Sequence, residues 1–158
     1  MLWFLRSLDK KEKKLRTKTP AVVFLVITAL ALFVFCVASR DTRSNVLQYA
    51  EKSGIIVLDR PVIGQVVSSP LTIAGIARGG WFFEATFPVR LVDANGKTIA
   101  VHYAEARGNW MTNDFVSFRL VLNFADSDTD TGFLILEKSN PSGLSRHADE
   151  LRIPVRFR

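Results

Sequence analysis

The chain of 158 residues has a single cysteine, Cys36, and two histidines, His102 and His147. One cysteine excludes an internal disulfide. A nucleophilic site needs a base beside a serine or cysteine, and the region after residue 40 has no cysteine and no G-x-S-x-G segment. The sequence therefore predicts a noncatalytic protein without a cofactor.

The region from Ser44 to the C-terminus also lacks net charge, since it holds twelve basic and twelve acidic residues. The formal net charge of +6 therefore arises from the N-terminal tail and the residues just after the apolar run. A nucleic-acid-binding domain would carry its basic patch on the folded part. We expect no nucleic-acid partner.

Long apolar runs are scarce too, apart from residues 21–38, which read AVVFLVITALALFVFCVA without charge, glycine or proline. With its flanks this run is long enough, as a helix, to cross a bilayer. Thr19 and Pro20 suit a helix start. We predict a single transmembrane helix and signal anchor at residues 20–39, in contact with membrane lipid.

Basic residues dominate the segment before this run and predict its orientation. Seven Lys or Arg accompany two acids in the first 20 residues. By the positive-inside rule, residues 1–19 form a cytoplasmic tail and the C-terminal domain is extracytoplasmic. The predicted location is the cell membrane.

A cleaved signal peptide is the alternative, since Val37-Ala38-Ser39 is an acceptable cleavage site. The basic segment and the apolar run are longer than is usual for such peptides, which favours the anchor. Acylation of Cys36 would require small residues before it, but Phe33-Val34-Phe35 are bulky. We interpret Cys36 as an apolar membrane residue.

Residues 40–54 read as a stalk with a short helix that Ser44 caps and Gly54 ends. After Gly54 the apolar period becomes two, and turn residues such as Asn95-Gly96 separate the runs. The predicted strands are residues 55–59, 62–67, 71–77, 82–92, 98–105, 115–124, 132–138 and 151–157. This pattern is typical of an all-β sandwich of the immunoglobulin type at residues 55–158.

The register of one hairpin follows from burial. A three-residue loop, Ala94-Asn95-Gly96, pairs Leu91 with Ile99 and continues to Val89 with Val101 and Phe87 with Tyr103. A two-residue loop would place the apolar faces of the two strands on opposite sides. The sequence therefore predicts the longer loop, with Val101 and Tyr103 in the core.

Three segments of the chain read PVIGQVVSSPLTIAGIA, FFEATFPVRLVDANG and a closing IPVRF. Together they resemble the second Gmad type of immunoglobulin-like domain, named from bacterial spore-germination and sporulation proteins. The resemblance covers roughly residues 55–157. GNWMTNDFVSF at 108–118 departs from it by its Trp and Met, and Asn140-Pro141-Ser142-Gly143 replaces a turn that often carries Asp-Gly.

The resemblance implies an extracytoplasmic immunoglobulin-like fold, no catalytic activity, and a place behind an anchor or beside other envelope domains. Accordingly, we expect a module that binds or assembles with other cell-envelope components. Its partner is expected to be an envelope protein.

Four residues are candidates for binding: Trp81, Glu84, Trp110 and Asp114. Exposed tryptophans stack on sugars or cover apolar patches of a protein partner. Together with the two acids they would suit a wall-glycan binder, such as a module for peptidoglycan. Alternatively, at least one tryptophan is a core residue, and the acids are surface and turn residues.

The segment 126–132 spaces Asp126, Asp128 and Asp130 like the acids of a calcium loop. The glycine, Gly132, comes one position late, and the following residues read as a strand. An acidic, solvated hairpin turn is the simpler interpretation. We therefore predict no metal site here, with calcium as the open alternative.

Overall fold

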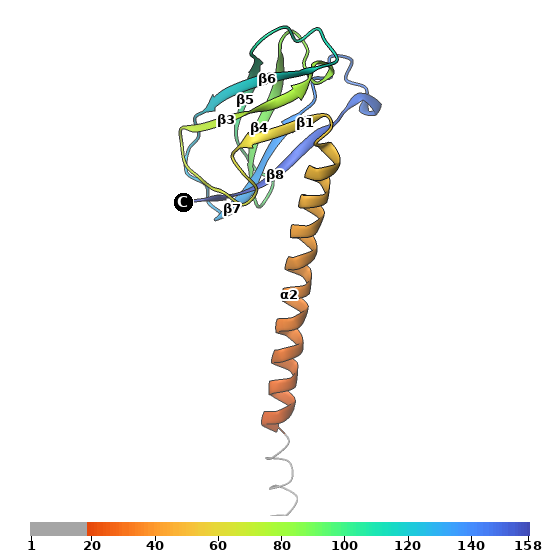
Figure 1. Cartoon of the computed structure of the whole chain (residues 1–158). Coiled ribbons are helices and arrows are strands. Elements are labelled where there is room, and N and C mark those ends of the chain that lie inside the picture. The colour runs from red at the N-terminus through yellow and green to blue at the C-terminus, as the bar shows by residue number, and fades with distance from the viewer. Residues whose placement is uncertain (1–18) are drawn as a thin grey trace, which may run out of the picture. The chain divides into compact units, whose positions relative to one another are not determined.

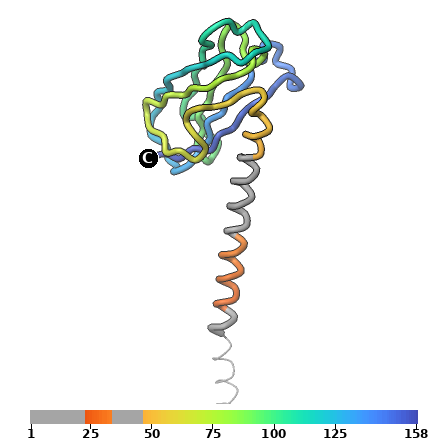
Figure 2. Tube along the Cα trace, in the orientation of Figure 1, coloured from red at the N-terminus to blue at the C-terminus, as the bar shows by residue number. Residues whose placement is uncertain are grey.

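The computed structural model describes the backbone of residues 19–158 and the side chains of residues 23–33 and 47–158 (Figure 2). The predicted tail therefore lies outside the described residues, except for Thr19. Among the described residues, no helix combines the length and hydropathy that a membrane span requires. The predicted span at 20–39, with Cys36, lies only partly within the described side chains.

A helix precedes a β domain (Figure 1). The elements are α2 (Thr19–Lys52), β1 (Ile56–Arg60), β2 (Val66–Val67), β3 (Leu71–Arg78), η1 (Gly79–Trp81), β4 (Thr86–Asp93), β5 (Thr98–Ala106), β6 (Phe115–Leu122), β7 (Thr131–Glu137), η2 (Ser145–His147) and β8 (Glu150–Phe157). The helix start predicted at Ser44 is wrong, because α2 continues through it. No glycine or proline interrupts residues 40–53, so nothing in that stretch breaks a helix.

Within residues 44–158, eight strands are hydrogen-bonded in the order β1-β3-β6-β5-β4-β7-β8-β2. All neighbours are antiparallel except β2 and β8. The sheet folds into two layers, with β1, β3 and β6 in one and β4, β7 and β8 in the other (Figure 1). This all-β sandwich confirms the predicted fold class of the domain.

The core lies between the layers. Phe87 of β4 contacts Phe82 and Phe118 edge-on, with ring centroids 5.2 and 4.9 Å apart, although β4 and β6 are not neighbours in the sheet. Successive side chains of a strand point to opposite faces of the sheet, so that β3, β6 and β8 each bury every second residue in this core. Burying such side chains contributes about 25 cal/mol per Å² of apolar surface.

The predicted strand 82–92 begins later than expected. Glu84 and Ala85 have φ of 49° and 61°, and Phe83 and Thr86 exchange two hydrogen bonds of 3.0 Å. These four residues form a two-residue hairpin turn of the primed type. The turn places Glu84 at an exposed tip instead of within a strand.

The predicted loop between β4 and β5 is present, but the predicted register is wrong. Asp93 N–H donates to the carbonyl of Lys97, and Gly96 has φ of 81°. An irregularity then shifts the pairing between Leu91 and Val92, so that Leu91 faces Ala100. An extra residue in one strand reverses which side chains face inward, so Val101 and Tyr103 are 54% and 55% exposed.

Candidate interaction surface

The loop between β5 and β6 presents large apolar side chains. Met111 is 74% exposed and Trp110 is half-buried. Both line a shallow open depression of about 350 Å³, whose other lining residues are Gly79, Gly80, Phe82, Thr112 and Asn113. An exposed methionine beside a tryptophan offers an adaptable apolar contact.

Hydrogen bonds hold this loop against the end of β3. Gly79 N–H donates to the carbonyl of Asp114 over 3.2 Å, and the side-chain Nη1 of Arg78 donates to the carbonyl of Asn113 over 3.1 Å. A Cβ on Gly79 would collide with the carbonyl oxygens of Thr112 and Trp110. The glycine thus permits a close approach of two backbones, and the loop is positioned by the sandwich.

The structure does not bring the four predicted binding residues into one site. Trp81 is only 1% exposed and belongs to the core, as the alternative interpretation of at least one tryptophan predicts. Its Nε1 is the buried side-chain polar atom without a partner in the described part of the chain. Glu84 lies at its turn, and neither it nor Asp114 lines the depression beside Trp110.

Asp114 takes part in local hydrogen bonds. Its backbone N–H donates to Thr112 Oγ1 over 3.1 Å, and Thr112 Oγ1 donates to its carboxylate over 3.3 Å. This geometry is that of a turn acid. Of the four candidates, Trp110 alone lines the depression.

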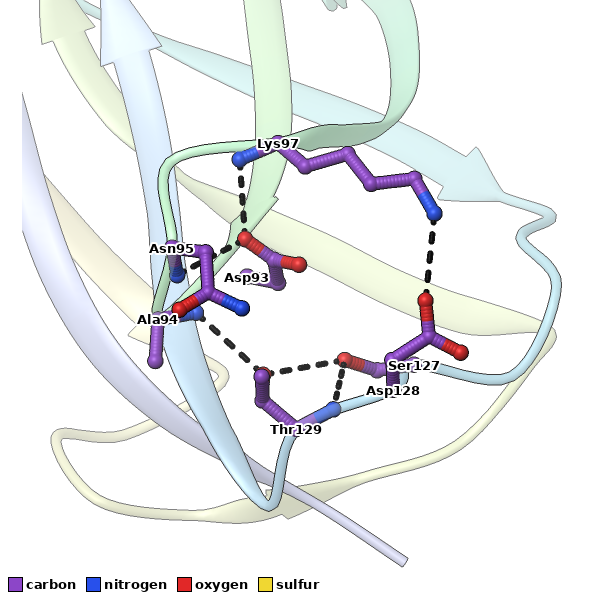
Figure 3. Close-up of polar contacts among 7 residues, drawn as sticks. All are labelled: Asp93, Ala94, Asn95, Lys97, Ser127, Asp128 and Thr129. Atoms are coloured by element: carbon purple, nitrogen blue, oxygen red, sulfur yellow. Dashed lines mark hydrogen bonds and ion pairs between the residues drawn. The ribbon is translucent and has the colours of Figure 1, made fainter.

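The acidic segment after β6 packs against the β4–β5 loop (Figure 3). Asp128 forms an ion pair of 3.2 Å with Lys97, and Thr129 Oγ1 accepts a hydrogen bond of 3.2 Å from Ala94 N–H. The buried Asp93 carboxylate accepts from Asn95 and Lys97 N–H over 2.9 and 2.8 Å. Asp126, Asp128 and Asp130 do not converge, and no group of three metal-binding side chains occurs among the described residues.

The loop before β8 holds a serine–histidine contact that no sequence motif indicated. Ser142 Oγ lies 3.2 Å from His147 Nδ1, while Arg146 Nε donates to His147 Nε2 over 3.2 Å. All three side chains are exposed. A cation thus occupies the position that an orienting carboxylate holds in a nucleophilic triad, so the contact serves the turn. The spacing of these residues in the sequence does not indicate that the serine and the histidine are in contact.

A second depression, of about 610 Å³, lies where the last turn of α2 meets β7 and β8. Lys52 pairs with Asp149 there, and Arg90 pairs with Glu137 over 2.5 Å. Because most of the charged side chains that line the depression lie in ion pairs, it does not offer a strongly charged binding site.

The fold and this surface define a class: an immunoglobulin-like β-sandwich module with an apolar loop at one end. A search of the curated proteins finds no match. The family of the immunoglobulin-like domain of bacterial spore germination, Gmad2, matches residues 55–144, and the chain belongs to it. β8 lies beyond the matched residues but supplies Leu151, Ile153 and Val155 to the core.

Proposed function

We propose that the chain is a membrane-anchored, extracytoplasmic module that has no catalytic activity and assembles with other cell-envelope components. Its membership in an immunoglobulin-like family supports the module. The apolar run at 21–38, preceded by a basic segment, supports the anchor and its orientation. The proposed partner is an envelope protein.

The observation that carries this proposal is the fixed apolar loop. Met111 is the most exposed of the large apolar side chains described after residue 46, and the loop that bears it is tied to Arg78 and Gly79. A preorganised loop loses little conformational entropy on binding. Trp110, half-buried beside it, is the type of residue that dominates protein interfaces.

Site-specific photo-crosslinking in cells tests this surface. A photoreactive amino acid at Met111 of the full-length protein is expected to give one discrete adduct, and Trp110→Ala should reduce its yield severalfold. The same probe at Val62, which is 59% exposed, is the matched control and should give none. Equal labelling from both positions would refute a binding loop at residue 111.

The anchor is tested separately. Protease added to intact cells or protoplasts should degrade the C-terminal domain and leave a short membrane-bound fragment. Carbonate extraction should leave the full-length protein in the membrane pellet. Release by carbonate, or protection of the domain, would contradict the proposed anchor and orientation.

Binding of a wall glycan is a second candidate, favoured by one observation: the half-buried Trp110 lines an open depression. An aromatic ring at such a place can stack on a sugar. Purified full-length protein in detergent should then sediment with peptidoglycan, and Trp110→Ala should release it. Sedimentation that is unaffected by this substitution would exclude the Trp110 site for glycan.

A further inference from the structure

Met111 carries the one sulfur atom of residues 37–158. The chain has two methionines and one cysteine, and the other two sulfur atoms belong to Met1 and Cys36, which both precede the β domain. Hydroperoxides oxidise the thioether of methionine to a sulfoxide, and this product is reducible again by dedicated enzymes. Within the β domain, oxidation of sulfur therefore falls on this residue alone.

The side chain of Met111 is open to a reagent in solution. It has the largest exposed fraction, 74%, among the large apolar side chains that the structure describes. It also lines a shallow depression that is open to solvent. Because a reagent has to reach the sulfur atom, exposure favours oxidation. We expect this thioether to react at a rate close to that of free methionine.

The backbone around Met111 is held by contacts that do not involve the thioether. Met111 N–H donates to Asn109 Oδ1 over 3.1 Å, and Thr112 N–H donates to the carbonyl of Trp110 over 2.8 Å. Oxidation of a buried methionine disrupts a core, because it places a polar oxygen there. Met111 does not belong to the core cluster. Its oxidation should therefore leave the domain folded and change only the surface of the loop.

A sulfoxide changes the character of this surface. It replaces a soft, polarizable thioether by a polar group whose oxygen accepts hydrogen bonds. In an apolar contact with a partner, that oxygen would be desolvated without a donor, which weakens binding by at least about fivefold. Trp110 stays in place, but the residue beside it no longer continues the apolar surface.

We propose that Met111 is a reversible oxidation site, at which hydroperoxides switch off binding by the loop that bears Trp110. The sulfur lone pair attacks the terminal oxygen of the hydroperoxide, and the O–O bond breaks. The proton of the attacked oxygen moves to the leaving oxygen, which departs as an alcohol or as water. The sulfur atom thus loses two electrons and the hydroperoxide gains them. This inference rests on the proposed function, because it describes the regulation of the same loop.

The chemistry is tested on the purified full-length protein in detergent. Hydrogen peroxide should convert Met111 to the sulfoxide at a rate within about tenfold of that of N-acetylmethionine amide, as read by peptide mass spectrometry. The melting temperature should be the same before and after oxidation. Slower oxidation than this, or unfolding of the oxidised protein, would overturn the proposal.

Binding is tested by photo-crosslinking in membranes. The photoreactive amino acid is placed at Asn113, an exposed residue that lines the same depression, so that Met111 stays intact. Peroxide treatment should lower the yield of the adduct by at least about fivefold, and methionine sulfoxide reductase should restore it. Met111→Leu is the matched control, because it keeps an apolar side chain without sulfur. Its adduct should be insensitive to peroxide, although peroxide reaches the partner there too.

Met111→Gln introduces a polar side chain of similar length and should give the low yield without peroxide. An adduct that persists after oxidation of Met111, or that is lost equally in Met111→Leu, would overturn the switch and leave the proposed function intact. If the untreated protein gives no adduct from Asn113, the binding loop itself is refuted, and the switch with it.

Discussion

Glu84 and Ala85 hold left-handed backbone conformations that favour Gly or Asn. The sequence run FFEATF alternates in a way that predicts a strand, and no local signal announces a turn at these two residues. The hairpin forms because Phe82 and Phe87 both pack in the core, 5.2 Å apart, and the chain must reverse between them. Tertiary packing therefore overrides the local preference.

Ala85→Gly is expected to stabilise the domain by about 0.5–1 kcal/mol, because glycine adopts positive φ without strain, partly offset by its greater freedom in the unfolded chain. Chemical denaturation measures the change. Ala94→Gly is the control, since the φ of Ala94 is not positive, and it should stabilise nothing. A loss of stability in Ala85→Gly would contradict the strain at this turn.

Gly79→Ala is expected to destabilise by about 1–3 kcal/mol, because the new methyl group collides with backbone atoms of the loop that bears Trp110. Gly80→Ala is the neighbouring control, since its Cβ meets nothing within 4 Å. Melting temperatures of both variants check the prediction. Equal melting temperatures of the two variants would show that the loop accommodates the methyl group without a loss of stability.

The candidate binding residues show how much of a site can be predicted from residue type alone. Trp81 and Trp110 both lie near glycines, and the sequence treats them alike. The structure buries Trp81 in η1 and leaves Trp110 at the surface. The distinction depends on Gly79, which brings the loop at residues 110–112 onto the end of β3.

At the scale of elements, the two-residue apolar period after Gly54 is realised in β3, β6 and β8, each of which buries alternate residues. The predicted strand at 62–67 shortens to β2, whose two residues pair with the end of β8. The irregularity at the start of β5 reversed the predicted inward face of that strand. A single inserted residue changes every later position, so register is the least predictable property of a hairpin.

The last turn of α2 is joined to the sandwich by Tyr49, whose hydroxyl donates to the Leu58 carbonyl over 2.8 Å and accepts from Leu58 N–H. Tyr49→Phe should therefore lower the free energy of unfolding by about 0.5–1.5 kcal/mol. Leu47→Ala, at a 68% exposed position on the same helix, should change it by less than about 0.5 kcal/mol. Denaturation of full-length variants in detergent measures both. Equal effects would argue against a specific role for the hydroxyl.

At the scale of the whole molecule, the two layers share one core that includes the last strand. Leu151, Ile153 and Val155 of β8 are each 1% exposed or less. A chain that ends at residue 149 loses these side chains and exposes the edge of β7. We expect it to be unfolded or degraded, as judged by limited proteolysis and circular dichroism, whereas removal of Arg158 alone should be tolerated. Folding of the truncated chain would show that the core closes without β8.

The sequence by itself determined the class of fold, because a two-residue apolar period reflects burial of one face of each strand, which is a local property. It also determined the charge distribution and the scarcity of catalytic side chains. Only the tertiary structure decided which tryptophan is buried, where β4 begins and which face of β5 meets solvent. These depend on contacts between residues distant in the chain, such as Phe87 with Phe118 and Gly79 with Thr112, that no local pattern encodes.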